Sequence, residues 1–220
     1  MDMPAPWRAA VVVAALLWLC AMPRAWDVDR AQQAAQRLGP RAVQGLRVLQ
    51  PVLASAVGVD DTQRLDAINQ FFNRFVVFRE DADVWQVTDH WASPLETLQQ
   101  GAGDCEDFAI AKYFALLASG MPASRLRLVY VRLQLGGPGG PGQAHMVLAY
   151  YAAPQAEPLI LDNLVTEIRP ASRRADLTPV FSFNSEGLWQ GAGAQSLGDP
   201  AARLSRWRDV LAKARAEGFL

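Results

Sequence analysis

The stretch GAGDCEDFAIAKYFALLASG, residues 101–120, lies near the middle of the 220-residue chain and decides how the chain folds. Gly101 and Gly103 allow a tight backbone turn, because glycine adopts conformations that other residues avoid. A helix is predicted to follow over residues 104–119 and to end at the next glycine. Cys105 therefore lies in the first turn of a helix, and three carboxylates surround it in the sequence.

The residues upstream of this stretch predict helices. Ser93-Pro94-Leu95-Glu96 is a capping box with proline at the first helical position. Apolar residues at helical spacing predict another helix from Asp60 or Asp61, and Val84–Val87 is expected to be extended. The earliest predicted helical segment covers residues 27–50, with a break at Leu38-Gly39-Pro40.

The residues downstream predict strands. LRLVYVRL (126–133) and AHMVLAYY (144–151) form a hairpin joined by the glycine- and proline-rich segment GGPGGPGQ, and shorter strands follow. The shorter strands are expected at 158–162, 181–183 and 188–189, before an amphipathic helix at 200–216 capped by Asp199. Helices followed by antiparallel strands indicate an α+β fold, and residues 26–220 are expected to form a single domain.

The composition limits the possible binding partners, and the N-terminus indicates where the protein is located. Hydrophobic residues make up 51% and the net charge is −1, so the chain lacks the basic surface that binding to nucleic acid requires. In residues 1–25, Arg8 precedes a 14-residue apolar run that is shorter than the ~20 residues of a membrane span. This pattern predicts a signal peptide, the alternative being an uncleaved anchor.

The cysteine count points to one reactive thiol. Cys20 lies inside the apolar run and would leave with it, so Cys105 alone remains. A helix N-terminus favours an anion, and a nearby imidazole can take the thiol proton. The backbone N–H of Cys105 could also stabilise an oxyanion. A buried cysteine without chemistry is the alternative.

Only two histidines can supply the base. His145 opens a predicted strand, whereas His90 lies in a loop without a rigid mount, so we favour His145 over His90. Asp162 closes the next apolar strand and is costly to bury unpaired, which makes it the candidate for orienting the imidazole. Asn163 remains an alternative for that role, and a purely structural His145 remains possible.

These residues resemble a known family. GDCEDFAIAKYFAL (103–116), AHMVLAYY (144–151), LILDNL (159–164) and PVFSFNSEGLW (179–189) are similar to segments of the bacterial transglutaminase-like cysteine proteinases. The resemblance covers about residues 84–189 and implies a papain-like/transglutaminase-like fold, in which N-terminal helices pack with an antiparallel sheet. It assigns Cys105 as nucleophile, His145 as general base and acid, and Asp162 as orienting carboxylate.

The resemblance also implies a cofactor and partners. Calcium is expected at Asp104, Glu106 and Asp107, which otherwise read as a helix cap and first-turn partners of the helix dipole. The expected substrate is the N-terminal region of a large biofilm adhesin at the cell surface, cleaved in the periplasm. A membrane-bound cyclic-di-GMP receptor is the expected inhibitor, without cyclic-di-GMP binding to this chain itself.

Other functions fit part of the pattern. A transglutaminase or a cell-wall peptide amidase would use the same three side chains on another acceptor. A calcium-binding domain with an inert cysteine would need no histidine. A zinc site formed by Cys105, His145 and His90 is the weakest alternative, because the histidines are not clustered in the sequence.

Overall fold

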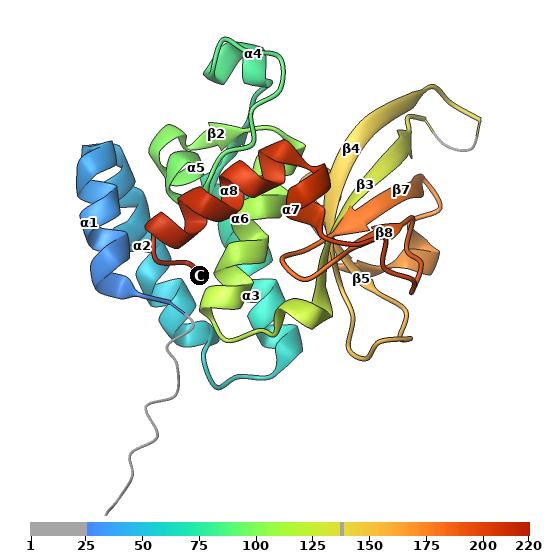
Figure 1. The fold of residues 1–220 in the computed structure, drawn as a ribbon, viewed down its shortest axis with the longest axis horizontal. Helices are drawn as coiled ribbons and strands as arrows, with labels where there is room; N and C mark the ends of the chain where they lie inside the picture. The colour runs from blue at the N-terminus through green and yellow to red at the C-terminus, as the bar shows by residue number, and fades with distance from the viewer. Residues whose placement is uncertain (1–25, 137–138) are drawn as a thin grey trace, which may run out of the picture.

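Helices make up the first half of the described chain, and a sheet makes up most of the second half (Figure 1). The computed structural model describes residues 26–136 and 139–220, so the expected signal segment at 1–25 lies outside the described residues. Within the described ranges, no helix combines the length and the apolar character that a membrane crossing requires. The helices of the first half are α1 (Val28–Leu38), α2 (Pro40–Ala56), α3 (Asp61–Phe75), α4 (Asp81–Val84), α5 (Pro94–Gln100) and α6 (Cys105–Ala118).

Local caps fix where the early helices begin and end. The Asp27 carboxylate accepts a hydrogen bond from a backbone N–H in the first turn of α1, and Asp60 does the same for α3. Gly39, with φ 117°, separates α1 from α2, so the predicted break is confirmed. These ends were predictable because each depends on a few neighbouring residues.

The pair α5 and α6 leads the chain directly to the cysteine. The Ser93 hydroxyl accepts from the backbone N–H of Glu96, and the Glu96 carboxylate accepts from the N–H of Ser93, which completes the predicted capping box. Helix α5 ends at Gly101, which has the left-handed φ of 62°. Helix α6 begins at Cys105, so the prediction that the cysteine lies in the first helical turn is confirmed.

The prediction of an extended segment at Val84–Val87 is wrong. Asp81–Val84 forms the short helix α4, which stands away from the other helices in Figure 1, and Gln86 follows with a φ of 58°. The strand near this position is β1 (Val77–Phe78), which pairs in parallel with β2 (Ala102–Gly103). A segment of four mostly apolar residues fits a helical turn as well as a strand, which explains the error.

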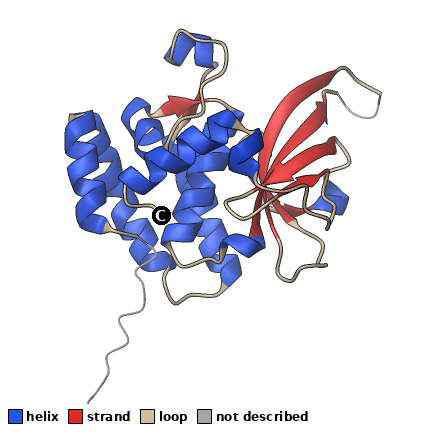
Figure 2. Ribbon diagram, in the orientation of Figure 1, coloured by secondary structure: helices blue, strands red, loops and turns tan. Residues whose placement is uncertain are grey.

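The predicted antiparallel strands and one further strand, β6, form a single six-stranded sheet in the order β6-β5-β4-β3-β7-β8. Figure 2 shows the sheet in red beside the helices. All of its neighbouring strands run antiparallel, and the central hairpin joins β3 to β4 as expected. The strands are β3 (Leu126–Gln134), β4 (Gly142–Tyr150), β5 (Leu159–Leu161), β6 (Arg169–Pro170), β7 (Leu177–Phe183) and β8 (Leu188–Gln190). Two 3-10 turns, Ala123–Arg125 and Ala171–Arg173, precede β3 and follow β6.

The sheet buries apolar side chains on both faces. Leu148 and Leu161 face the main core, which also includes almost all of α6. Val147 and Ala149 belong to a second cluster on the other face, as expected for alternate residues of a strand. Because each fully buried aliphatic side chain contributes about 2 kcal/mol, this packing holds α6 firmly against the sheet.

The C-terminal helix is divided in two, contrary to the prediction of one helix over 200–216. α7 (Pro200–Arg203), capped by Asp199 as expected, is followed by Leu204 with an extended backbone and then by α8 (Ser205–Ala216). The break turns α8 so that Trp207 is fully buried, stacks on Phe114 and donates to the carbonyl of Asn184. Tertiary packing of one large side chain thus overrides a continuous helical pattern.

Candidate active site

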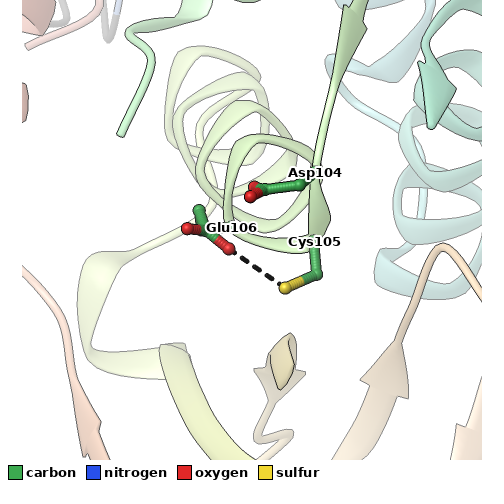
Figure 3. A group of neighbouring side chains, drawn as sticks. All are labelled: Asp104, Cys105 and Glu106. Carbon is green, nitrogen blue, oxygen red and sulfur yellow. Dashed lines mark hydrogen bonds between the residues drawn. The ribbon is translucent and has the colours of Figure 1, made fainter. Parts of the chain in front are cut away.

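Cys105 lies at the first position of α6 and is half-buried. Its Sγ donates a hydrogen bond to Glu106 Oε2 at 3.0 Å, so the thiol and the carboxylate point toward one another (Figure 3). Asp104 precedes the helix, but its side chain makes no capping hydrogen bond. The alternative that Asp104 serves only as a helix cap therefore has no support in the geometry.

The surroundings of the thiol favour its neutral form when no cation is present. Burial raises the pKa of Cys105, and the negative charges of Glu106 and Asp104 raise it further. Contact with the backbone of Met146 lowers this pKa, but to a smaller degree. A thiolate at Cys105 therefore needs compensating positive charge from elsewhere.

His145 and Asp162 form a buried hydrogen-bonded pair. His145 Nε2 lies 2.8 Å from Asp162 Oδ1, and the two side chains are 4% and 0% exposed. The register of β4 and β5 brings them together, since Leu148 pairs with Leu161, immediately before Asp162. Because Asp162 engages Nε2, the Nδ1 atom is the ring nitrogen left to exchange a proton with another group.

Asp162 is held as an anion. Burial alone would raise its pKa, but the hydrogen bond and charge of His145, the backbone N–H of Leu164 and the guanidinium of Arg174 lower this pKa to about 2. Asp162 rather than Asn163 contacts the imidazole.

One cavity is shared by the cysteine and the histidine of this pair. It has a volume of about 450 Å³, and Cys105, His145 and Met146 all line it. No hydrogen bond joins Sγ to the His145 ring in the part of the chain that the structure describes, since the thiol faces Glu106 instead. His90 lies elsewhere, with its ring 4.1 Å from the ring of Trp85 and its Nε2 3.6 Å from Glu96 Oε2.

Three buried carboxylates lie close together near Cys105. One oxygen each from Asp81, Asp104 and Asp107 lies within 4.8 Å of the others. Asp81 Oδ1, Asp104 Oδ1 and Asp107 Oδ2 are buried without a hydrogen-bond partner among the described residues. Buried oxygens without donors are costly, so this cluster has the chemistry of a hard-cation site. Glu106 joins Asp81 and Asp89 in an adjoining group of the same kind.

The electrostatics of the cluster agree with this interpretation. Burial, together with the negative charges of Glu106, Asp107 and Asp81, raises the pKa of Asp104 to about 10. Burial likewise raises the pKa of Asp107 well above its usual value and raises that of Asp81. Three such acids repel one another when ionised, and a cation between them would remove this repulsion.

The sequence did not single out Asp81. It follows β1 closely, and Asp104 follows β2 directly, so the parallel pairing of these strands brings the two acids to the same end. Gly103 permits the close approach, because a Cβ there would lie 2.4 Å from Asp107 Oδ2. The acids in EDADVW (80–85) are a visible signal, but only the strand pairing shows which of them turns inward.

Three further residues around Asp162 were also missed. The backbone carbonyl of Asp162 accepts from Lys112 Nζ at 3.1 Å and from Asn73 Nδ2 at 2.9 Å. Lys112 is fully buried, and this burial lowers its pKa to about 7. Arg174 Nη2 lies 2.8 Å from Asp162 Oδ2. A lysine within the apolar run AIAKYFAL (109–116) was a signal for the first of these.

Replacement of Glu106 by glutamine should speed alkylation of Cys105 near pH 7 in the presence of a chelator. The change removes the charge nearest to the thiol, and the thiolate fraction rises about tenfold for each unit by which the pKa falls. Peptide mass mapping would follow Cys105 itself. Glu80→Gln is the matched control, because Glu80 lines the same cavity without a hydrogen bond to the thiol. Equal rates in Glu106→Gln and the parent protein would refute this electrostatic account.

The fold and the site together define a class of protein. A cysteine at a helix N-terminus that shares a cavity with a histidine–aspartate pair from an antiparallel sheet is the arrangement of a papain-like or transglutaminase-like cysteine protease. A model of the bacterial transglutaminase-like cysteine proteinases matches residues 50–178, and the chain belongs to this family. The fold expected from the resemblance is thereby confirmed.

Solved structures support the assignment. LapG of Legionella pneumophila in an EGTA-treated form is 37% identical, and the match covers 85% of this chain and 97% of that one with a TM-score of 0.74. The calcium-bound form of the same protein is 37% identical over 85% and 98% of the two chains, with a TM-score of 0.71. No curated protein sequence matches the chain significantly.

Proposed function

We propose that this cysteine protease is a calcium-dependent periplasmic endopeptidase that uses Cys105, His145 and Asp162 as its catalytic triad. The observation that carries the proposal is the buried His145–Asp162 pair, whose histidine lines the same cavity as Cys105 at the start of α6. The three side chains come from α6, β4 and the end of β5, elements that packing holds against one another.

The residues of the proposed triad have different roles in peptide-bond cleavage. The Sγ atom of Cys105 attacks the peptide carbonyl carbon, and its proton passes to His145 Nδ1 after the thiol leaves Glu106. His145 then gives that proton to the leaving amine, and water releases the acyl group from Sγ. Asp162 keeps Nε2 protonated and oriented throughout. The backbone N–H of Cys105 stabilises the oxyanion.

Calcium is the proposed cofactor, and Asp81, Asp104 and Asp107 are its proposed principal ligands, with Glu106 beside them. The support comes from the convergent unpartnered oxygens of the three buried acids and from the calcium-bound relative. When bound there, the ion supplies positive charge that offsets the carboxylates around the thiol. This ligand set keeps the three residues expected from the resemblance and adds Asp81.

The family resemblance is the basis for extending the proposal to the substrate, the partners and the location. We propose that the substrate is the N-terminal region of a large surface adhesin, whose cleavage releases the adhesin from the cell. Export through the signal peptide at 1–25 would place the enzyme in the periplasm with that substrate. A membrane-bound cyclic-di-GMP receptor is the proposed inhibitor, acting through its periplasmic domain.

The function is tested by incubating the protein with an N-terminal adhesin fragment from the same organism, in calcium and in EGTA. Two cleavage products in calcium and an intact fragment in EGTA are expected. Crosslinked or amine-labelled fragment would instead identify a transferase, and an intact fragment in calcium would contradict the proposed substrate. A fragment whose cleavage site is deleted controls for unspecific proteolysis.

A further inference from the structure

The two oxygens of Asp162 have different partners. Oδ1 contacts His145 Nε2 at 2.8 Å and accepts from the backbone N–H of Leu164 at 3.1 Å. Oδ2 forms an ion pair with Arg174 Nη2 at 2.8 Å, although the angle of this contact is not that of a hydrogen bond, and the arginine side chain is only 3% exposed. The imidazole and the guanidinium thus take opposite oxygens of one buried carboxylate.

Arg174 is itself held in place. Its Nε and Nη2 atoms donate to the carboxylate of Asp176 at 3.0 and 2.8 Å, and its backbone N–H donates to Ala171. Because two of its nitrogens are hydrogen-bonded to Asp176, the planar guanidinium has a fixed orientation, and so does its contact with Asp162. The neighbouring Arg173 is exposed and forms no ion pair within the described residues.

We infer that Arg174 is a positioning residue of the active site: its guanidinium holds Asp162 Oδ2, so that Oδ1 stays directed at His145 Nε2. The inference rests on the proposed triad. Lys112 and Asn73 fix only the backbone carbonyl of Asp162, and the Leu164 N–H holds only Oδ1, so these contacts alone leave the carboxylate able to rotate about Oδ1. Arg174 is the group that fixes this rotation, and through it the orientation and tautomer of the imidazole.

The charges around Asp162 support this role. The charged or titratable groups that face it are His145 from β4, Lys112 from α6, and Arg174 with its partner Asp176. Arg174 is among the groups that lower the pKa of Asp162 to about 2. Removal of the guanidinium would raise this pKa, so protonation of Asp162 would interrupt the pair at a higher pH than in the parent protein.

The test compares Arg174→Met with Arg174→Lys, and uses Arg173→Met, a change at the exposed neighbouring arginine, as the control. Arg174→Met should lower kcat roughly 10- to 100-fold, the usual effect of losing an outer partner of a functional histidine, with little change in KM. The acidic limb of the pH–kcat profile should move to higher pH. Arg174→Lys should recover part of kcat, and Arg173→Met should stay close to the parent protein.

The state of the His145 imidazole can also be measured directly, without an assay of substrate cleavage. The chain has two histidines, so ¹⁵N spectra show two imidazoles, and His90→Gln assigns them. We expect a slowly exchanging Nε2–H of His145 in the parent protein and in Arg173→Met, and its loss in Arg174→Met. If this dependence is seen although no adhesin fragment is cut, the proposed function fails while the role of Arg174 stands.

A purely structural Arg174 would give a different result. The thermal midpoint of Arg174→Met would fall, while kcat, the acidic limb and the ring signal stayed unchanged, and that outcome overturns the inference. If Arg174→Met does not fold, Arg174→Gln takes its place, because its amide nitrogen reaches about as far as the arginine Nε, which contacts Asp176, and not as far as Nη2, which contacts Asp162. Parent-like kcat and ring signal in Arg174→Gln would overturn the inference equally.

Discussion

Replacement of Cys105 by alanine is expected to abolish cleavage of the adhesin fragment, with a loss of about six orders of magnitude in kcat. The reason is that no other side chain in the cavity offers a nucleophile beside His145 and Asp162 at a helix N-terminus. The fold should survive, because Cys105 is only half-buried and its one side-chain hydrogen bond goes to the half-buried Glu106. A surface-like change of this kind alters stability by about 0.5 kcal/mol.

The measurement is the cleavage rate in calcium, set beside the thermal midpoint of the same preparation. Cys105→Ser is the matched control, since a hydroxyl keeps a donor for Glu106 but is a far weaker nucleophile than a thiolate. Both variants should be inactive and folded. Cleavage that persists in Cys105→Ala would show that the reaction uses another residue, and the proposed triad would have to be abandoned.

Much of this architecture could be predicted from sequence because its determinants are local. Asp27, Ser93 and Gly101 mark helix ends through contacts within four residues, and each end was found where expected. Where distant packing decides, local patterns failed. The break at Leu204 exists because Trp207 enters the core, and the sequence pattern of α8 contains no sign of it.

The residues of the candidate site also fall into those that local sequence patterns could place and those that only tertiary contacts could place. Cys105 could be placed by the glycines and the helix around it, and His145 and Asp162 by the order of the strands. Asp81 and Arg174 could not be placed, since each reaches the site through a tertiary arrangement: the β1–β2 pairing for Asp81, and the turn after β6 for Arg174. Neither arrangement has a period or a motif that the sequence displays.

Replacement of Asp107 by asparagine is expected to have opposite effects on stability with and without calcium. In EGTA near pH 7 the variant should be more stable than the parent protein, because burial and the neighbouring acids oppose the ionisation of Asp107, and a neutral asparagine avoids the cost of keeping that acid protonated. The folded pKa values of Asp104 and Asp107 are raised, so the folded calcium-free protein binds more protons than the unfolded chain. Its stability should therefore fall as pH rises from about 4, the unfolded pKa of these acids, toward the folded pKa of Asp104, about 10.

With calcium the order should reverse. An ion at one hundred times its dissociation constant stabilises the parent protein by about 2.7 kcal/mol, which for a chain of this size corresponds to roughly 5–10 °C in the thermal midpoint. Asp107→Asn should lose most of this calcium-induced shift, because Asp107 is fully buried with Oδ2 directed at the cluster. Asp83→Asn, a change at an exposed acid of α4 outside the cluster, should keep it. A full calcium-induced shift in Asp107→Asn would place the ion elsewhere. If instead the stability difference between the variant and the parent protein changes sign between EGTA and calcium, Asp107 must repel its neighbours in one state and bind the ion in the other.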